Sequence, residues 1–356
     1  MIGWGRQGES NIKIFLFGYY GMNNYGDEML LRSILKLLKE VGIEEIDLLY
    51  PRKGSRKIGG IKINHVLRSS PFAILNSIRN ADILIGGGGN LFQDETSSRS
   101  FFYYRVLIST ALFLKKPVLL MGHGIGKISS KRHFKQLRKI LSNELCTGYF
   151  RDDISYRYAR SCSAAHKRGT DLGYLFLRKR QASRMVPGRI GVFLKRPWEN
   201  AEDFTRAFKD EGIEEIQFFV AFPEQDLKIS EEAAERFGEH FITSVKVGEV
   251  NDITDQASTC SLIISERLHG AIISSYFAIP FIAADTFKMR SYFTDIEGFE
   301  GYFKDKSLSE IVYAISKMRE IDFEGANQKF TDRNFARLRA MKRWLRIQIL
   351  KRPIKQ

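Results

Sequence analysis

The sequence lacks the long apolar run and the paired cysteines that mark membrane-spanning or disulfide-stabilised proteins. A spanning helix needs about 18 apolar residues in succession, and the nearest candidate, around Leu107–Met121, is interrupted by Lys115 and Lys116. The N-terminus lacks the basic-then-apolar order of a signal peptide. The three cysteines are widely spaced and odd in number, so they predict neither a disulfide framework nor a zinc site. We expect a cytoplasmic protein with no metal and no cofactor.

Acidic residues are also scarce, and most so at the C-terminus. The chain has 41 Asp and Glu against 56 Lys and Arg, a net charge of +15. From residue 333 to the end there is no acidic residue and there are nine basic ones. A single basic segment on an otherwise milder chain predicts a local docking surface. Since no known nucleic-acid-binding module is present, we expect no nucleic-acid partner.

Short apolar runs alternate with amphipathic stretches, which is typical of a parallel α/β fold. The length of 356 residues fits two domains. In the first half we predict strands at 12–18, 46–50, 82–85 and 117–121 and a helix at 27–40. In the second half we predict strands at 189–194, 215–221, 262–265 and 280–284 and a helix at 202–210. The periodicity breaks near Pro187, so we predict domains at 1–183 and 184–332 and a basic amphipathic helix at 333–356.

These predictions describe two Rossmann-like α/β domains facing a cleft. In such sheets, ligands bind beyond the carboxyl ends of the strands. Glycine-rich segments follow several of the predicted strands, so these strand ends are the candidate binding sites.

The segment Gly18–Asp27 follows the first predicted strand and opens a helix. Its glycine spacing is that of a phosphate loop, but Asp27 stands where such a loop needs lysine, which makes a nucleoside-triphosphate site improbable. Two interpretations stay open: a glycine turn with Asp27 stabilising the helix N-terminus, or binding of sugar hydroxyls by Asn23, Asn24 and Asp27.

A run of four glycines ends in Asn90 directly after the strand at 82–85. Glycines let a ligand approach backbone N–H groups closely, and these can hold an anion. A plain tight turn is the alternative.

The segment Ser265–Gly270 pairs a fixed cation with a titratable imidazole at a predicted strand end. The planar guanidinium of Arg267 suits a carboxylate or a phosphate, and His269 can move a proton near neutral pH. The alternative is a salt-bridged helix start, and Glu266 could orient either residue.

These motifs, taken in order, resemble the polysaccharide pyruvyl transferase family over roughly residues 12 to 295. The matching segments are Gly21–Glu28, Ala81–Asn90, Gly122–Gly126, Arg151–Ser155, Gly191–Trp198 and Glu266–Gly270. The resemblance implies a GT-B-like arrangement of the two domains. It also implies transfer of pyruvate from phosphoenolpyruvate to a sugar of a cell-surface polysaccharide or its lipid-linked precursor, as a ketal.

The resemblance further implies roles for single residues. Because phosphoenolpyruvate carries a carboxylate and a phosphate, its site needs several cations and backbone donors. The predicted donor-binding residues are Arg151, Arg196, Arg267, Lys288, Gly87, Gly88 and Gly89. His269 and Arg267 are the predicted catalytic residues, and the predicted acceptor-binding residues are Asn23, Asn24, Asp27 and Asn90. The alternative function is a GT-B glycosyltransferase that uses a nucleotide sugar.

The C-terminal helix is a separate candidate site. Apolar residues recur in it at helical spacing, with Trp344 beside them: Phe335, Leu338, Met341, Leu345 and Ile349. One interpretation is a helix lying on an anionic membrane at the inner face of the plasma membrane. The other is a terminal helix whose apolar stripe packs on the protein itself.

Overall fold

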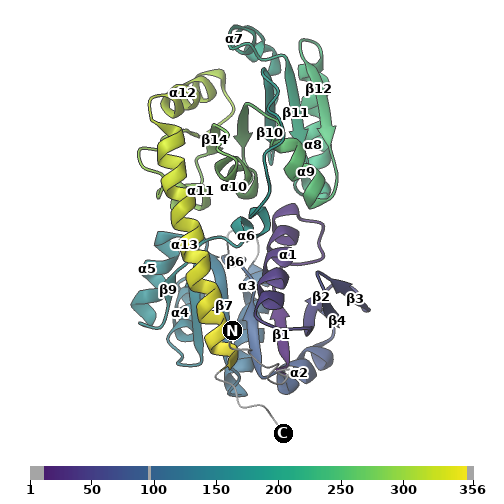
Figure 1. Cartoon of the computed structure of the whole chain (residues 1–356), viewed down its shortest axis with the longest axis vertical. Coiled ribbons are helices and arrows are strands. Elements are labelled where there is room, and N and C mark those ends of the chain that lie inside the picture. The colour runs from purple at the N-terminus through teal and green to yellow at the C-terminus, as the bar shows by residue number, and fades with distance from the viewer. Residues whose placement is uncertain (1–11, 95–97, 351–356) are drawn as a thin grey trace, which may run out of the picture. The chain divides into compact units, whose positions relative to one another are not determined.

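The structure is a computed structural model that describes residues 12–94 and 98–350. Its residues group into two compact units. Unit 1 comprises Met1–Met22, Leu30–Leu172 and Arg337–Gln356, and unit 2 comprises Asn23–Met29 and Gly173–Ala336. Helices flank the strands of each sheet (Figure 1). The predicted domain limits at 183 and 332 stay a prediction.

Unit 1 contains one sheet and the helices that connect its strands. Its strands are β1 (Ile14–Phe17), β2 (Glu45–Tyr50), β3 (Ser55–Ile58), β4 (Ile61–Leu67), β5 (Ile83–Gly86), β6 (Gly89–Phe92), β7 (Val118–Ile125), β8 (Cys146–Phe150) and β9 (Lys167–Arg168). Its connecting helices are α2 (Pro71–Asn80), α3 (Ser98–Phe113), α4 (Lys131–Leu141) and α5 (Asp153–Cys162). Helix α1 (Tyr25–Glu40) begins with residues of unit 2 and continues in unit 1.

The sheet of unit 1 has the strand order β3-β4-β2-β1-β5-β7-β8-β9, with β6 paired to β7. The pairs are parallel except for β3 on β4. Without the antiparallel edge strand β3, the order of β4-β2-β1-β5-β7-β8 is that of a Rossmann fold.

Unit 2 holds a second parallel sheet and most of the remaining helices. Its strands are β10 (Arg189–Phe193), β11 (Glu215–Phe219), β12 (Ile242–Lys246), β13 (Leu262–Ser265), β14 (Phe281–Ala284) and β15 (Tyr302–Phe303). Its helices are α6 (Gly173–Leu177), the short 3₁₀ helix η1 (Ala201–Asp203), α7 (Phe204–Asp210), α8 (Pro223–Gly238), α9 (Val250–Ala257), α10 (Leu268–Tyr276), α11 (Phe287–Phe293) and α12 (Leu308–Arg319).

The strand order of unit 2 is β12-β11-β10-β13-β14-β15, all parallel. It repeats the Rossmann order of unit 1, so each half of the chain is a doubly wound α/β unit. The predicted fold class of two Rossmann-like α/β domains is confirmed.

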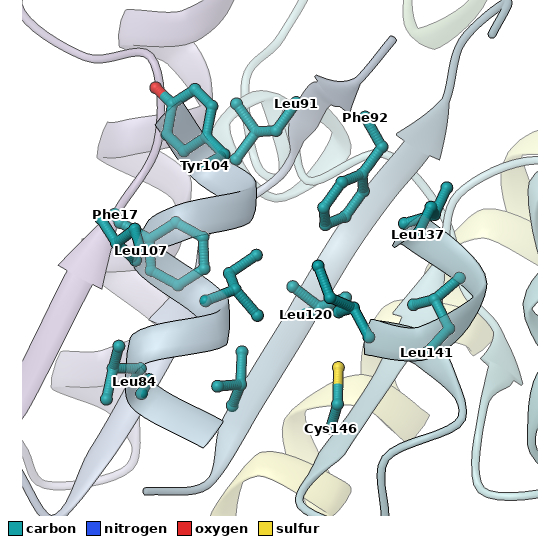
Figure 2. Close-up of a cluster of buried hydrophobic side chains, with 14 of the residues drawn as sticks. Phe17, Leu84, Leu91, Phe92, Tyr104, Leu107, Leu120, Leu137, Leu141 and Cys146 are labelled. Carbon is teal, nitrogen blue, oxygen red and sulfur yellow. The ribbon is translucent and has the colours of Figure 1, made fainter. Parts of the chain in front are cut away.

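The apolar strands are buried on both faces, as a parallel sheet covered by helices requires. Every residue of β5, β7, β13 and β14 is buried. In unit 1, side chains from β1, β5 and β7 form one buried cluster with those of α3 and α4, in which Phe17 lies beside Leu107 and Leu120 beside Leu141 (Figure 2). This core holds the strand ends of unit 1 in place.

A long C-terminal helix, α13 (Phe323–Leu350), contributes residues to both units. It begins ten positions before the predicted start at Arg333. Four residues of its apolar stripe are buried, with at most 7% of each exposed: Leu338, Met341, Leu345 and Ile349. Within unit 1, the rings of Trp344 and Tyr149 pack edge to face at 5.2 Å. Packing on the protein itself is therefore the interpretation that the structure supports, and the stripe is not available for insertion into a membrane. Residues 351–356 of this predicted segment lie outside the described residues.

No helix among the described residues is both long and apolar enough to cross a bilayer.

We predict that Leu345→Ala lowers the free energy of unfolding by about 2–5 kcal/mol, because it leaves a cavity at a fully buried position. The neighbouring Arg346 is exposed on the same helix, so Arg346→Ala serves as the matched control and should change stability little. Urea denaturation of both variants measures the difference. Equal, small effects would mean that α13 does not pack as described.

Candidate functional site

The reversal of strand order in unit 2 lies between β10 and β13, which pair in parallel through Val192 and Ile264. The chain leaves these two strands toward opposite sides of the sheet, and this opens a crevice beyond their carboxyl ends. In doubly wound sheets, ligands bind at this point. Lys195 and Arg196 follow β10, and Glu266 to His269 follow β13. The chemistry-bearing motif therefore lies where the topology places a site.

Glu266 is the centre of the hydrogen bonding at this edge. Its carboxylate, 3% exposed, accepts hydrogen bonds from the backbone N–H groups of Lys195 at 2.7 Å and Arg196 at 3.0 Å. The Nε of Arg196 donates at 2.8 Å, and the Nζ of Lys306 donates at 3.2 Å. Burial acts to raise the pKa of Glu266, but the charge of Lys306 and these donors outweigh it and lower the pKa. Glu266 therefore orients Arg196 and Lys306, and the predicted orientation of Arg267 or His269 by Glu266 stays a prediction.

Lys306 is a site residue that the sequence analysis missed. It lies in the loop between β15 and α12 and its side chain is 7% exposed. Burial lowers the pKa of Lys306, and the carboxylate of Glu266 opposes that shift. No local motif marks this lysine, because its partner stands 40 positions earlier.

Arg267 is held by a second buried carboxylate, that of Asp226 at the start of α8. Asp226 is fully buried and also accepts a hydrogen bond from the backbone N–H of Phe222 at 3.0 Å. Burial raises the pKa of Asp226, and the Arg267 guanidinium opposes that rise. Among the described residues, the Nε of Arg267 has no hydrogen-bond partner. Its guanidinium also donates to Oε1 of Gln225 at 3.3 Å, so the arginine is held in place by side chains of α8.

His269 lies in the first turn of α10 and packs against Gly26 of α1. A Cβ atom at Gly26 would overlap Nδ1 of the imidazole and lie 2.6 Å from its Cε1. The start of α1 is fixed to unit 2 on its other side as well. The N–H of Tyr25 donates to the carbonyl of Ala221 at 2.7 Å, and its hydroxyl lies 2.6 Å from Oγ1 of Thr254. Glycine at position 26 is therefore what lets the imidazole approach this backbone.

Asn24 caps helix α1, since its Oδ1 accepts the N–H of Asp27 at 3.2 Å. Such a cap is the preferred role of asparagine at this position. Asn23 has a left-handed φ of 55°, and Asp27 lies in the first turn, where a negative charge is favoured. The glycine-turn interpretation of this segment thus describes its structure, and binding of sugar hydroxyls by these residues stays a prediction.

Lys288 lies at the carboxyl end of β14, in the first turn of α11. Thr286 caps this helix by accepting the N–H of Met289 at 3.3 Å. Because β14 is the neighbour of β13, Lys288 lies on the same sheet edge as Arg196, Arg267 and His269. The structure brings these four predicted residues together at one edge of unit 2.

The other predicted residues belong to unit 1. Arg151, at the end of β8, is 1% exposed and pairs with Asp171 at 2.8 Å. It also donates to the Oδ1 of Asn90 at 2.6 Å. Glycine is needed at position 124, because a Cβ there would lie 2.8 Å from the Nε of Arg151. The arginine is thus already neutralised and enclosed, so donor binding by Arg151 and acceptor binding by Asn90 stay predictions.

Gly87, Gly88 and Gly89 are buried beside the reversal point of the first sheet, next to β1. The N–H of Gly87 donates to the carbonyl of Phe17 at 3.2 Å, and its carbonyl accepts the Tyr20 hydroxyl at 2.8 Å. Gly88 and Gly89 have left-handed φ values of 94° and 85°, which other residues rarely adopt. The run therefore makes a tight, packed turn, and anion binding by its N–H groups stays a prediction.

His123 is a fully buried imidazole next to this turn. Its Nδ1 lies 3.2 Å from the carbonyl oxygen of Gly89. Burial lowers the pKa of His123 to about 4. The ring is therefore neutral at physiological pH and acts as a polar packing element.

The described residues contain no group of three or more His, Cys, Asp or Glu side chains that could hold a metal ion. A metal-free mechanism stays a prediction.

A family model for polysaccharide pyruvyl transferase matches residues 24–286. This range includes the glycine run at 86–89 and the segment Ser265–Gly270. The chain belongs to the polysaccharide pyruvyl transferase family. The predicted family is confirmed. No curated protein matches the sequence.

Solved structures of nucleotide-sugar enzymes share the fold of this family member. The S. aureus MnaA–UDP structure has 13% sequence identity and a TM-score of 0.62, covering 97% of this chain and 100% of that one. A UDP-N-acetylglucosamine 2-epimerase from Rickettsia bellii has 9% identity and a TM-score of 0.58, covering 94% and 98%. An α,α-trehalose 6-phosphate synthase from Burkholderia multivorans has 10% identity and a TM-score of 0.51, covering 96% and 98%. At these identities the similarity establishes the GT-B fold class alone.

We predict that Gly26→Ala displaces the His269 imidazole of this pyruvyl transferase family member and lowers its melting temperature. In the His269→Ala background the ring is gone, so the same glycine substitution should have a much smaller effect. Double-mutant thermal denaturation measures this coupling. Gly248→Ala is the matched control in unit 2, because its Cβ would meet only ordinary contacts at 3.5 Å. Additive effects of the two substitutions would show that Gly26 and His269 are not in contact.

We also predict a pH dependence from His123. The pKa of His123 in the folded protein, about 4, lies below its ordinary value of 6.5, so only the unfolded chain takes up this proton between these pH values. The free energy of unfolding should therefore fall as pH drops through this window, by on the order of 3 kcal/mol from this group. His123→Gln cannot titrate and should show a shallower fall in urea denaturation series at pH 7 and pH 4.5. Parallel curves for the two proteins would contradict the burial of a neutral imidazole.

Proposed function

We propose that this protein transfers a pyruvyl group from phosphoenolpyruvate to two hydroxyls of a sugar and forms a ketal. The observation that carries the proposal is the edge of the unit 2 sheet where Arg196 follows β10, Arg267 and His269 follow β13, and Lys288 follows the neighbouring β14. Family membership supports the same reaction class. The acceptor is proposed to be a polysaccharide or its lipid-linked precursor.

The cations at this edge suit a small donor with two anionic groups. Arg267 is held by Asp226, and 17% of its side chain is exposed. The side chain of Arg196 pairs with Glu266 and is still 53% exposed. A guanidinium fork fixed in this way can bind the carboxylate or the phosphate with two parallel hydrogen bonds. Such preorganised charges supply electrostatic stabilisation of the transition state.

His269 is proposed to move the protons of the reaction. It first protonates the methylene carbon of phosphoenolpyruvate, which leaves a cation-like centre at C2. A sugar hydroxyl attacks C2, and its proton returns to the imidazole. Cleavage of the C2–O bond releases phosphate, and a second hydroxyl attacks C2 to close the ketal. The two hydroxyl protons end on the new methyl group and on the released phosphate, so atoms and charge balance without an oxidant or a metal.

The start of α1 is the proposed acceptor side of this site. Gly26 touches His269, which places Asn23, Asn24 and Asp27 one to three residues from the contact. Their side chains suit sugar hydroxyls, and Asn90 is the corresponding candidate in unit 1. Arg151 and Gly87 to Gly89 are the candidate donor ligands in unit 1.

A nucleotide-sugar glycosyltransferase is the second candidate. It is supported by the fold shared with structures described as UDP enzymes. The two candidates differ in the donor, so calorimetric titration with phosphoenolpyruvate and with UDP-N-acetylglucosamine separates them. The proposal expects binding of phosphoenolpyruvate and no comparable heat from the nucleotide sugar. The reverse result would favour the glycosyltransferase.

We predict that Arg267→Lys weakens phosphoenolpyruvate binding nearly as much as Arg267→Ala, because a point charge cannot reproduce the planar fork that Asp226 holds. Arg319→Lys is the matched control, since Arg319 makes a two-pronged contact with Glu211 on the exposed surface and belongs to no candidate site. Full binding by Arg267→Lys would show that the site needs only positive charge.

We predict that His269→Ala leaves phosphoenolpyruvate binding nearly unchanged and lowers the transfer rate about 10²–10⁴-fold, the usual contribution of a general acid–base group. Phosphate release in the presence of acceptor measures the rate. A variant with normal turnover would remove His269 from the mechanism.

A further inference from the structure

Helices α2, α3 and α4 cover one side of the sheet in unit 1 and form what we call the α2–α4 face. They connect strands that advance in the same direction through the sheet, from β4 to β8, and right-handed crossovers place such helices on the same side. Helix α3 packs against both α2 and α4.

The α2–α4 face contains no Asp or Glu in any of its three helices and contains eight Lys and Arg. Five of the eight lie on α4: Lys131, Arg132, Lys135, Arg138 and Lys139. All five are exposed. The carboxylate of the nearby Asp94 already accepts hydrogen bonds from the N–H groups of Ser129 and Ser130. All the charged Lys, Arg, Asp or Glu side chains of these three helices are therefore positive.

The same helices also carry large apolar side chains that are exposed to solvent. Phe72 at the start of α2 is 88% exposed, and Phe113 at the end of α3 is 85% exposed. Phe102 and Val106 are 58% and 40% exposed. In α3, positions 102, 106 and 113 follow helical spacing, so they form one outward stripe about 16 Å long. Exposed phenylalanines in a row are uncommon on a surface that faces only water.

Helix α4 also lines an open hollow of about 450 Å³ formed by Lys131, Arg132, Lys135, Gln136 and Lys139. Four of these five side chains are cationic donors without a competing carboxylate in the lining. Cationic side chains are suited to hydrogen bonding with phosphate-bearing groups.

We propose that the α2–α4 face docks onto an anionic lipid bilayer, with Phe72, Phe102 and Phe113 entering the interface and the cations of α4 binding phospholipid headgroups. Basic residues beside exposed aromatic ones are the chemistry that an anionic membrane surface selects. This surface takes the role that the sequence analysis gave to the C-terminal helix. The apolar stripe of α13 is buried, whereas that of α3 is exposed.

The apolar component favours a bilayer over a nucleic acid. The phosphate backbone of a nucleic acid would pair with the cations of α4 but would leave the exposed Val106 without an apolar partner. A bilayer interface removes all of this apolar surface from water. This membrane docking does not depend on whether the protein transfers a pyruvyl group or a sugar.

The test is co-sedimentation of the full chain with phosphatidylcholine vesicles, prepared with and without phosphatidylglycerol, at low and high salt. We expect binding only to the anionic vesicles, weakened by salt because screening shortens the range of the attraction. Replacing Lys131, Arg132, Lys135 and Lys139 by Ser should lower partitioning about fivefold per residue. Phe72→Ser with Phe113→Ser should lower it by roughly tenfold or more.

Two control variants keep the test specific. Ile242→Ser removes a 69% exposed apolar side chain from β12 in unit 2, and replacing Arg339, Arg343 and Arg346 by Ser removes exposed cations of α13. Both should retain binding, and all variants should keep the melting temperature of the wild type because the side chains are exposed. The proposal is overturned if the wild type does not bind, if neutral vesicles bind equally, or if the α13 variant loses as much binding as the α4 variant. It is also overturned if single-stranded nucleic acid, and not vesicles, binds in a Phe72- and Phe113-dependent way.

Discussion

The candidate site is organised around the buried carboxylate of Glu266, whose negative charge needs hydrogen-bond donors and cations nearby. Glu266 is nearly inaccessible to solvent, and an unpaired charge in such a place would cost several kcal/mol. Four donors meet it: two backbone N–H groups after β10, the guanidinium of Arg196 and the ammonium of Lys306. Together these contacts fix the ends of three strands, β10, β13 and β15, relative to one another. The same contacts set where the cations of the site point.

Arg267 follows the same design through Asp226, so two guanidinium groups at this edge are positioned by buried acids. A cation that is held before the ligand arrives loses little conformational entropy on binding. The two carboxylates also partly neutralise the arginines. Without them, the positive charges of the empty site would repel one another. In the proposed anion site, the guanidinium donors are therefore positioned by carboxylates before a ligand binds. His269 is aimed differently, by the close approach of the α1 backbone at Gly26.

The sequence predicted what local patterns and the family motifs encode. The strands β10, β13 and β14 and the helix α1 agree with the predicted segments to within a few residues, because buried parallel strands are continuous apolar runs bounded by glycine or proline. The strand β12 was missed, since its residues are half-buried or exposed and give no apolar run. Asp226 and Lys306 were missed for another reason: each is separated from its partner by about forty residues, and only the sheet order brings them together. The capping role of Asn24, in contrast, could have been found from its position before an acidic helix start.

The central claim is that unit 2 holds phosphoenolpyruvate at the β10–β13 reversal for transfer of its pyruvyl group. Incubating the protein with phosphoenolpyruvate and a soluble glycan that offers neighbouring hydroxyls, followed by mass spectrometry of the glycan, tests it most directly. We expect the glycan to gain one pyruvate unit less one water, with one phosphate released for each glycan modified and neither event with the His269→Ala variant. A glycan that stays unchanged here, yet gains a sugar residue when a UDP-sugar replaces phosphoenolpyruvate, would contradict the account.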